Sequence, residues 1–440
     1  MLPRFPDFDY RNLAGLMARL KKLLPPEYWL VLETVSGLAQ AEGQTVYLVG
    51  GLVRDLILGR ANFDMDFVCL KDALKLARRL LPRFEALPEI ATVKLTEHPA
   101  FRTVRFDLAF TSGTNLHLDL ATARYEIYSK PAALPTVAPE PATLEEDLRR
   151  RDFTINAMAL SLIKGLVDPF NGLEDLRTGT LRVLHSASFE DDPTRMVRGV
   201  RYAARYGYHF EPKTTQRLEE AMTKGFFTLL SVKRKYHELR LLLEEAQPEN
   251  GLDLLQNYQL LQAIQPGLTW NETLKANFYH LREHLPFTPS ATAYLATLLH
   301  LAGPIQAKAV ADGLHLSQEE AHLVISLAQL WQEIRPKLIP NLKNSQLYAL
   351  LHPYSTPAEI LATFEALLPE PKQVTLVEHY RKELADLRPQ TNGDFLIKQL
   401  GLRPGPHFKE WLAALLAAVL DGEVQGREAE EAFLRHRAFN

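Results

Sequence analysis

VYLVGGLVRDLILGRANFDMDFVCL, residues 46–70, is the stretch of this sequence from which the fold can be inferred. It opens with an apolar run rich in valine, Val46 to Val49, which predicts a buried strand. Gly50 and Gly51 interrupt that run, and Leu52 to Leu58 has the pattern of a short helix. A glycine turn that leads into a helix can present backbone N–H groups to phosphates. We therefore expect Gly50 and Gly51 to contact a triphosphate.

The end of the same stretch places two carboxylates side by side. The segment Phe63 to Val68 has the composition of a second strand. Residues two apart on a strand point to the same face, so Asp64 and Asp66 project together while the apolar residues around them point the other way. Two carboxylates flanked by buried residues repel each other unless a cation lies between them. Asp64 and Asp66 are therefore the predicted catalytic residues and metal ligands.

Each of these features alone has an ordinary structural explanation, because most diglycines are turns and most DxD pairs on strand edges are solvated. Their combination with Arg54 and Asp55 is more specific. GGxVRD followed closely by DxD resembles the first motif of the class II tRNA nucleotidyltransferase and bacterial poly(A) polymerase family, within the polymerase-β-like superfamily. The resemblance implies an α+β fold, in which a polymerase-β-like nucleotidyltransferase head domain precedes an elongated all-helical neck, body and tail.

The composition excludes several classes of protein. A single cysteine, Cys69, excludes intramolecular disulfides and cysteine-based zinc sites, which suits a reducing cytosol. The first residues lack a signal-peptide core, and the longest apolar run, Trp411 to Leu420, is too short to cross a bilayer. We expect a cytoplasmic protein without membrane contact. Because the net charge is −3, RNA binding would require basic residues to be concentrated locally.

Hydrophobic periodicity divides the chain into a mixed α/β part and a helical part. Residues 8–42 have a helical period, and three strand-like runs follow between Thr92 and Leu120, where Asp119 could be a third carboxylate beside the metal. A proline-rich loop over residues 121–143 has the length of a functional or disordered segment. From Asp192 onward the spacing predicts helices. We predict a catalytic head, a neck with a nucleotide-selecting helix, a helical body and a tRNA-binding tail, over residues 1–150, 151–250, 251–350 and 351–440.

A second motif, RRDFTINAMA, begins at Arg150. Three consecutive arginines are usually a surface patch, but here they lie between a loop and an apolar hairpin. Arginine is also the side chain best suited to bind phosphate through two hydrogen bonds. The segment is similar to the family's second motif almost letter for letter. The resemblance implies that Arg150 and Arg151 face the ribose and triphosphate, with Asp152 and Asn156 holding them in place.

Base recognition is predicted near residue 192. Asp192 precedes Pro193 and would be a good helix N-cap, which is the structural explanation. Asp192 and Arg195 also share one helical face. A carboxylate can accept from the exocyclic amine that cytosine and adenine have and uracil lacks, and an arginine can donate to the adjacent ring acceptor. This pair could therefore select C and A without a nucleic-acid template.

The same segment resembles the family's EDxxR motif, which implies nucleotide-binding roles for Asp191, Asp192 and Arg195. Aspartate at 191, where glutamate is common, leaves the nucleotide specificity open. A basic stripe for the triphosphate or the RNA backbone continues through Arg198, Arg201 and Arg205.

Two weaker motifs follow the same family pattern. The segment from Asp168 to Leu176 is similar to DPFGGxxDL, for which we expect a structural or hinge role. The segment from Ser231 to Glu238 resembles SxERxxxE, and we expect Arg234 and Glu238 to form an ion pair along one helix.

These motifs predict a template-independent tRNA nucleotidyltransferase that adds C and A to the tRNA 3′ end from CTP and ATP. Asp64 and Asp66 would hold two Mg²⁺ ions, one activating the 3′-hydroxyl and the other stabilising the leaving pyrophosphate. Arg54 would join Gly50 and Gly51 at the triphosphate. The helical half would bind the acceptor and T arms of tRNA by shape and phosphate contacts.

Three alternatives stay open. An enzyme that adds only the final A would share these motifs, and so would a poly(A) polymerase, which differs in product length. The long loop over residues 121–143 argues against an enzyme that adds only CC. A non-catalytic RNA-binding protein on a retained scaffold is the third alternative, and the intact DxD argues against it. The sequence does not indicate the oligomeric state or how addition ends.

Overall fold

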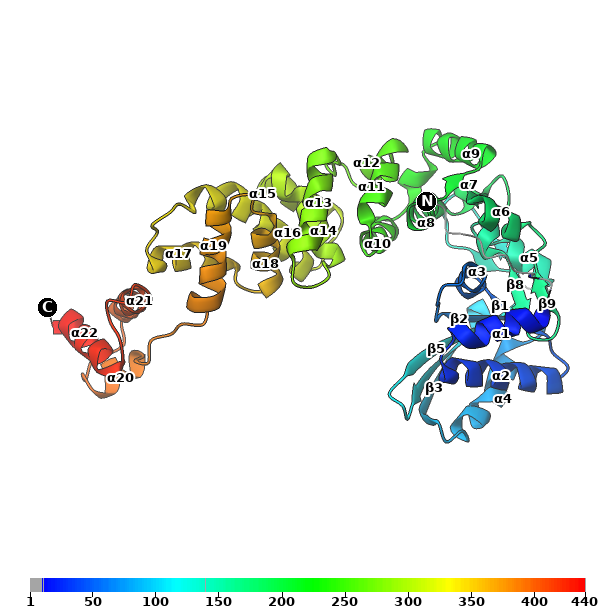
Figure 1. Ribbon diagram of the computed structural model, residues 1–440, viewed down its shortest axis with the longest axis horizontal. Coiled ribbons are helices and arrows are strands. Elements are labelled where there is room, and N and C mark those ends of the chain that lie inside the picture. Colours follow the sequence, from blue (N-terminus) through cyan, green and yellow to red (C-terminus); the bar gives the residue numbers. More distant parts are fainter. Residues whose placement is uncertain (1–9, 11, 139, 440) are drawn as a thin grey trace. The chain divides into compact units, whose positions relative to one another are not determined.

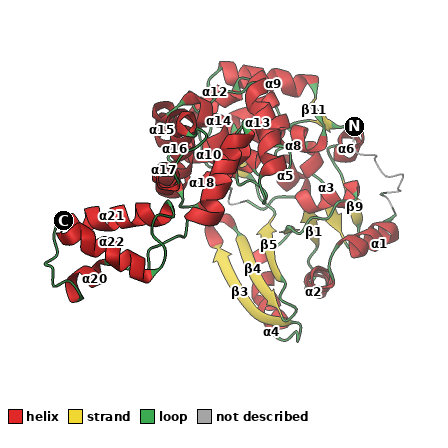
Figure 2. Cartoon of the chain, turned by 60° about the vertical axis from the view of Figure 1, so that its left-hand side comes forward, coloured by secondary structure: helices red, strands yellow, loops and turns green. Residues whose placement is uncertain are grey.

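The computed structural model describes residues 10, 12–138 and 140–439. They divide into two compact units, with the boundary between Glu238 and Leu239. Figure 1 shows the order of the elements along the chain, and Figure 2 shows the strands in yellow. All strands of the large sheet belong to the first unit. The predicted fold class, a mixed-sheet head followed by a mostly helical remainder, is confirmed.

The core of the first unit is a seven-stranded mixed sheet with the strand order β3-β4-β5-β2-β1-β8-β9. β2 and β5 run parallel, and the other neighbouring pairs are antiparallel. This order places β2 in the middle of the sheet, next to both β1 and β5. The strands are β1 (Val46–Val49), β2 (Met65–Cys69), β3 (Ile90–His98), β4 (Thr103–Phe110), β5 (Asn115–Thr122), β8 (Ala159–Ser161) and β9 (Gly165–Val167).

Amphipathic helices accompany this sheet. The α4 helix buries Leu76, Leu80 and Phe84 on one face and packs against β3, β4 and β5. The helical period predicted for residues 8–42 is confirmed over the described part, while residues 8, 9 and 11 lie outside the described residues. The helices are α1 (Leu13–Leu23), α2 (Pro26–Ala41), α3 (Gly51–Leu58), α4 (Ala73–Glu85) and α5 (Leu144–Arg149).

The strand–turn–helix prediction for the stretch around the diglycine is confirmed. Gly50 has φ 73° and ψ −138°, a conformation that side-chain-bearing residues rarely adopt, and left-handed Gly59 closes α3. The second strand begins later than expected, at Met65. Phe63 is not in the strand: it is 47% exposed, and its ring packs 5.2 Å from that of Tyr28. The expectation that Asp64 lies between buried strand residues is therefore wrong.

The strands predicted between Thr92 and Leu120 are confirmed as β3, β4 and β5, and the hairpin near Gly165 is confirmed as β8 and β9. The proline-rich segment contains a small antiparallel hairpin of β6 (Glu126–Ile127) and β7 (Thr136–Val137). Cys69 is fully buried, and burial raises the pKa of its thiol to about 12, which agrees with a packing role.

The rest of the first unit contains α6 (Gly172–Thr178), α7 (Ser188–Asp191), α8 (Thr194–Tyr206), α9 (Pro212–Thr223) and the start of α10 (Val232–Leu243), together with the 3₁₀ turn η2 (Thr154–Asn156). The expectation of helices alone after Asp192 is wrong at one point. The short strand β11 (His209–Phe210) pairs in parallel with β10 (Thr180–Leu181). Asp168 accepts hydrogen bonds from the backbone N–H groups of Gly172 and Leu173, which supports a structural role for its motif.

The second unit is helical throughout its described residues. Its tail has a small hydrophobic core of its own, built around Phe395, Leu396, Leu415 and Leu434. No helix in the described part of the chain is long and apolar enough to span a bilayer. The helices are α11 (Pro248–Asn257), α12 (Leu260–Ile264), α13 (Glu272–His284), α14 (Ala291–Leu299), α15 (Pro304–Gly313), α16 (Gln318–Gln329), α17 (Asn344–Leu351), α18 (Ala358–Leu367), α19 (Pro371–His379), α20 (Gly393–Lys398), α21 (Pro406–Leu420) and α22 (Arg427–Phe439).

Candidate catalytic and nucleotide-binding site

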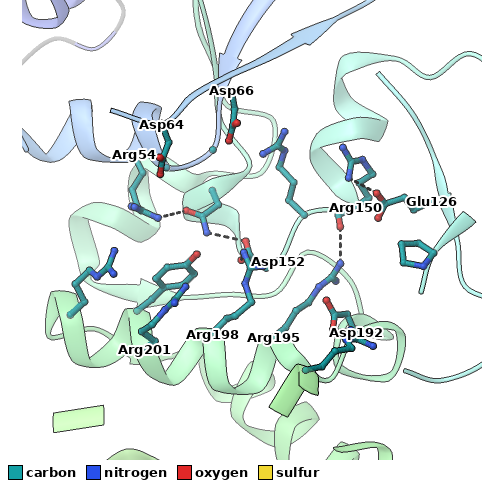
Figure 3. A pocket seen from close by; sticks show the side chains of 18 of the residues that line it. Arg54, Asp64, Asp66, Glu126, Arg150, Asp152, Asp192, Arg195, Arg198 and Arg201 are labelled. Atoms are coloured by element: carbon teal, nitrogen blue, oxygen red, sulfur yellow. Dashed lines mark hydrogen bonds and ion pairs between the residues drawn. The ribbon is translucent and has the colours of Figure 1, made fainter. Parts of the chain in front are cut away.

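One pocket of about 610 Å³ in the first unit is lined by every predicted site residue except Asp191 and the suggested third carboxylate, Asp119 (Figure 3). The residues come from the glycine turn, the start of β2, the segment after α5, and α8. The chain as a whole carries a charge of −3, but positive side chains are concentrated here. The arginines that line the pocket are Arg54, Arg150, Arg151, Arg195, Arg198, Arg201, Arg205 and Arg234.

The two predicted metal ligands lie on the same side of this pocket (Figure 3). Asp66 is partly buried on β2, whereas Asp64 is exposed and precedes the strand. Burial raises the pKa of the Asp66 carboxyl to about 6. The guanidinium of Arg151 opposes this shift, and the carboxylates of Asp119 and Asp64 add to it.

This environment fits a divalent cation. Carboxylate oxygens are the ligands that Mg²⁺ prefers, and a cation would offset the burial and the charge repulsion that together raise the pKa of Asp66. The described residues contain no cluster of three or more Asp, Glu, His or Cys side chains arranged to hold a metal. Two carboxylates would therefore leave coordination positions for substrate phosphates and water, which is the usual arrangement for Mg²⁺.

Asp119 lies beside Asp66 but already has a partner. The two residues are directly opposite each other in the parallel pairing of β2 and β5. Arg105 on β4 is opposite Asp119 on its other side and donates to both carboxylate oxygens, at 2.9 and 2.7 Å. The structure thus brings the suggested third carboxylate close to Asp66, with a guanidinium bound to it.

The glycine turn lies against the same groups. A Cβ atom on Gly50 would lie 3.3 Å from the Nη1 of Arg151 and 3.7 Å from the Oδ2 of Asp66. A side chain here would therefore press on the arginine and touch the carboxylate, in addition to the strain of a positive φ. Gly50 keeps the space between them open.

Arg54 is almost completely buried, and its guanidinium is held by the protein. Its Nε and Nη2 donate to both oxygens of Asp55, and its Nη1 donates to the Oδ1 of Asn156 at 2.7 Å. The rings of Tyr202 and Tyr206 lie 5.3 and 5.1 Å from it. These contacts favour a structural role for Arg54 at the edge of the pocket.

The expected role of Asp152 and Asn156 is corrected. They do not hold Arg150 and Arg151. Asn156 donates to Asp152 at 2.9 Å and accepts from Arg54, and Asp152 accepts from the Nη2 of Arg198 at 2.7 Å. Burial opposes ionisation of Asp152, but the charge of Arg198 and the hydrogen bond from Asn156 lower its pKa. This network joins α3 to α8 through the RRDFTIN segment, as the dashed lines in Figure 3 show.

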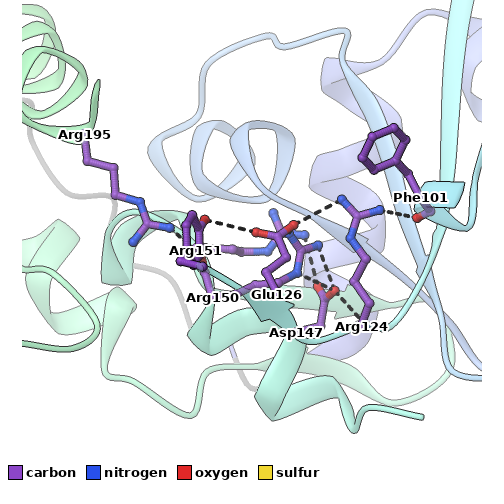
Figure 4. A network of polar contacts seen from close by, with 8 residues as sticks. Phe101, Arg124, Glu126, Asp147, Arg150, Arg151 and Arg195 are labelled. Atoms are coloured by element: carbon purple, nitrogen blue, oxygen red, sulfur yellow. Dashed lines mark hydrogen bonds and ion pairs between the residues drawn. The ribbon is translucent and has the colours of Figure 1, made fainter. Parts of the chain in front are cut away.

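Arg150 and Arg151 have different surroundings (Figure 4). Arg150 donates to the fully buried Asp147 through Nε and Nη2 and to Glu126 through Nη1. Arg151 has one longer contact, 3.4 Å, to Asp147, and its buried Nε has no hydrogen-bond partner among the described residues. Arg151, which also lies beside Gly50, is therefore the better candidate for binding a phosphate.

The predicted base-selecting residues are held by different partners. Arg195 is 4% exposed and donates to the Oγ of Ser188 at 2.7 Å and to the carbonyl of Arg150 at 2.8 Å. Asp192 accepts from the backbone and hydroxyl of Thr194 and from the Nη2 of Arg234 at 2.7 Å. The expected pair of Arg234 with Glu238 is wrong, because Arg234 instead bonds Asp192 and the carbonyl of Ala132.

Asp191, by contrast, does not line the pocket. Its carboxylate lies 3.9 Å from the Nδ1 of His185, at the end of α7. Burial raises its pKa. The sequence could not show that Asp192 lines the pocket and Asp191 does not, because both are aspartates. Their positions depend on how α7 leads into α8.

Several lining residues were not predicted. Asn62 lies between α3 and β2, Tyr202 lies one helical turn after Arg198, and the others come from the proline-rich segment. For the residues of the proline-rich segment, the length of the segment was the only signal, and it indicated a functional loop without identifying individual residues. They are Asn62, Glu126, Tyr128, Leu134, Pro135 and Tyr202.

Known proteins are similar to this chain in sequence. The sequence profile of the Poly A polymerase head domain matches residues 46–182. An A-adding tRNA nucleotidyltransferase of Halalkalibacterium halodurans is 32% identical, over 96% of this chain and 95% of its own. A CCA-adding enzyme of Streptococcus thermophilus is 30% identical, over 95% of this chain and 96% of its own.

A solved structure extends the similarity to the three-dimensional fold. The CCA-adding enzyme of Thermotoga maritima, complexed with tRNA, matches 96% of this chain and 98% of its own, with a TM-score of 0.72 and 27% sequence identity. The match therefore includes both the sheet-containing unit and the helical unit. With the full-length sequence relatives, it shows that this chain is a member of the family of tRNA nucleotidyltransferases that contains the A-adding and CCA-adding enzymes.

Proposed function

We propose that the protein transfers nucleotides from CTP and ATP to the 3′ end of tRNA without a nucleic-acid template. The observation that best supports this is the meeting of Asp64, Asp66 and Arg151 in one arginine-lined pocket. Nucleotidyl transfer needs carboxylates for a divalent cation and cationic side chains for the phosphates. Both are present here within reach of a glycine turn.

Asp64 and Asp66 would hold Mg²⁺, and the bound ions would supply Lewis-acid stabilisation of the charge that develops on the phosphates. Arg151 binds the triphosphate, and Arg198 and Arg201 on α8 bind phosphate groups of the nucleotide or the RNA. The 3′-hydroxyl of the RNA gives up its proton to water, its oxygen bonds to the α-phosphorus, and the bond from that phosphorus to pyrophosphate breaks. Arg151 then neutralises charge on the departing group.

Asp192 and Arg195 select the base. Arg195 is held by Ser188 and the carbonyl of Arg150, and Asp192 is held by Arg234, so both present their remaining hydrogen-bonding atoms in set directions. Fixed donors and acceptors can replace a template, because a base that leaves one of them unpaired binds less well. Asp191 is assigned no direct contact with the nucleotide.

The helical regions predicted as body and tail, residues 251–350 and 351–440, bind the acceptor and T arms of tRNA in this proposal. The structure of the Thermotoga maritima relative in complex with tRNA supports tRNA as the partner. The single cysteine supports a reducing, cytoplasmic location.

Two candidate activities follow. The first is addition of the complete CCA sequence, which the relative from Streptococcus thermophilus supports. The second is addition of the final A alone, which the full-length similarity to the A-adding enzyme of Halalkalibacterium halodurans supports. A poly(A) polymerase would share the head-domain profile but would make a long product.

The test uses three tRNA transcripts that end at the discriminator base, at C and at CC, each with CTP, ATP or both and with Mg²⁺. Extension of all three to CCA assigns complete CCA addition. Extension of only the CC-ending transcript, by one A, assigns A addition. A long ladder of A assigns poly(A) synthesis, and no extension of any transcript refutes the proposed transfer reaction.

A further inference from the structure

Asn62 connects the loop before β2 to a buried carboxylate. It lies between α3 and β2 and lines the pocket. Its Oδ1 accepts a hydrogen bond from the backbone N–H of Asp64 at 2.9 Å, and its Nδ2 donates to the Oδ2 of Asp55 at 2.6 Å. One amide therefore joins the backbone of a predicted metal ligand to a second acidic residue.

That second residue is firmly held. Asp55 is 6% exposed, and its carboxylate also accepts from the Nε and Nη2 of Arg54, at 3.0 and 2.8 Å. The hydroxyl of Tyr206, on α8, donates to the same carboxylate at 3.0 Å. Asn62 is thus attached to a group that several buried donors hold in place, and a buried network of this kind has few alternative arrangements.

The preceding turn leaves room for the Asn62 amide. A Cβ atom on Gly51 would lie 3.1 Å from the Nδ2 of Asn62 and 3.5 Å from the Nη2 of Arg54. The first distance is tighter than ordinary contact, so a side chain at Gly51 would press on the amide. The need for space beside the Asn62 amide therefore explains why residue 51 is a glycine, without any contact to a phosphate.

Asp64 needs such an attachment, because the sheet does not hold it. β2 begins at Met65, so the pairing that orders Asp66 against Asp119 does not extend to Asp64. Asp64 is also exposed. The hydrogen bond to Asn62 is what constrains its backbone N–H.

We propose that Asn62 is a positioning residue for the reaction: it holds the backbone of Asp64 so that its carboxylate stays beside that of Asp66 and the two can share divalent ions. This inference rests on the proposed nucleotidyl transfer and adds a residue to it. Asn62 would act through Asp64 and need not touch the nucleotide. Its loss should therefore affect metal binding and turnover more than nucleotide affinity.

The experiment compares Asn62→Ala and Asn62→Ser with wild type. Mn²⁺ binding to the protein without nucleotide is measured by electron paramagnetic resonance, and kcat and the KM for ATP are measured on the tRNA substrate that wild type extends. For Asn62→Ala we expect kcat to fall about 10- to 100-fold with a KM for ATP within about twofold, because a small misplacement of a reacting group costs this much. We also expect the Mn²⁺ dissociation constant to rise about tenfold.

Serine can still accept from the N–H of Asp64 but is too short to reach Asp55, so Asn62→Ser should recover part of the lost kcat. The exposed neighbour Ala61 provides the matched control, and Ala61→Ser should behave as wild type. A melting temperature close to that of wild type in all variants separates positioning from unfolding.

The inference is overturned if Asn62→Ala binds Mn²⁺ as wild type does, or if its KM for ATP rises while kcat is unchanged. The inference is also overturned if partial unfolding of the variant, judged by its melting temperature, accounts for the whole loss of kcat. Failure of wild type to extend any transcript would refute the proposed function instead, and the Mn²⁺ measurement would still decide the role of Asn62.

Discussion

The Nη1 of Arg54 lies 2.7 Å from the Oδ1 of Asn156, a residue 102 positions later in the chain. Asn156 donates a hydrogen bond to Asp152, and Asp152 accepts another from Arg198 on α8. A buried chain of polar groups therefore joins the glycine-turn helix to α8, the helix that carries Arg195, one of the two predicted base-selecting residues. Because unpaired buried polar groups are costly, this chain constrains how the two helices sit across the pocket.

Asn156→Ala should weaken this connection. The substitution leaves a buried donor of Arg54 without its partner and removes one of the two hydrogen bonds to the Oδ1 of Asp152, so we expect the free energy of unfolding to fall by about 1–3 kcal/mol. Activity should fall as well, because Asn156 holds Asp152 in place, and Asp152 in turn holds the guanidinium of Arg198 at the pocket. Urea unfolding and single-turnover kinetics measure the two effects. Asn115→Ala, at an exposed position, is the control and should change stability by less than about 0.5 kcal/mol.

Asp66→Asn should stabilise the metal-free protein while abolishing transfer. The pKa of Asp66 is about 6 in the folded chain against an ordinary 3.8, so the folded state binds more protons than the unfolded state between these values. Stability therefore decreases as pH rises from about 4 to 6, and above pH 6 the ionised carboxylate costs at most about 3 kcal/mol.

Urea unfolding in EDTA at pH 4 and pH 7 measures this effect. Asp66→Asn should be more stable than wild type at pH 7 by about 1–3 kcal/mol and should lack the decrease between the two pH values. Glu145, whose side chain is 59% exposed, provides the control through Glu145→Gln. A variant less stable than wild type at pH 7 would contradict the assigned cause of the shift.

Asp191 and Asp192 should respond differently to the same substitution. Asp192 lines the pocket and holds Arg234, so Asp192→Asn should lower kcat/KM for the preferred nucleotide by about 100-fold or more. Asp191 lies outside the pocket beside His185, so Asp191→Asn should change kcat/KM by less than about threefold. Competition experiments with CTP and ATP measure the relative kcat/KM of both variants for the two nucleotides. Equal losses would mean that Asp191 does contact the nucleotide.

Asp119→Asn tests whether the carboxylate beside Asp66 is a metal ligand. Because Arg105 occupies both oxygens of Asp119, we expect transfer activity to stay within about fivefold of wild type. Loss of a true ligand would instead raise the Mg²⁺ requirement by about 10- to 100-fold or more. Activity measured over a range of Mg²⁺ concentrations distinguishes the two results.

His300 should make the helical unit sensitive to acid. Its ring is fully buried, with the Nδ1 2.6 Å from the carbonyl of Thr297 and the ring of Trp331 at 4.6 Å. Burial lowers its pKa to about 4 from 6.5, so the unfolded state binds more protons and stability is lost as pH falls from 6.5 toward 4. At pH 5 the loss is about 2 kcal/mol.

Chemical unfolding at pH 7 and pH 5 checks this loss. His300→Gln removes the titrating ring, so its unfolding free energy should change less between the two pH values than that of wild type, even if it is lower throughout. His436→Gln, at an exposed position on α22, should keep the wild-type dependence. An unchanged pH dependence in His300→Gln would assign the acid sensitivity to another group.

Local patterns carried much of what could be predicted. The strand, glycine turn and helix around Gly50 follow from short-range backbone preferences, and β3, β4 and β5 follow from alternating hydrophobicity. These features depend on neighbours within a few residues. Phe63 shows the limit of this approach. Its apolar side chain looked like a strand residue, but β2 begins only at Met65, and Phe63 packs instead against the ring of Tyr28 from α2.

The partners of the charged residues could not be read in the same way. Arg150 and Arg151 are adjacent and chemically alike, yet one is held by Asp147 and Glu126 and the other keeps an unpaired Nε. Arg234 was expected to bond within its own helix and instead bonds Asp192 and Ala132. Side chains of this length can reach many partners, and the choice depends on which elements pack nearby.

The sequence by itself determined the order of the elements, the chemistry available at the site and, through its motifs, the family to which the chain belongs. Only the tertiary structure decided which of those residues meet. Asp191 lies outside the pocket, and Asp119 is bonded by Arg105. Asn62 forms hydrogen bonds with both Asp55 and Asp64. The physical reason is that propensity and periodicity act over a few residues. Buried charges and amides are satisfied by whatever groups the fold places beside them, often far away in the chain.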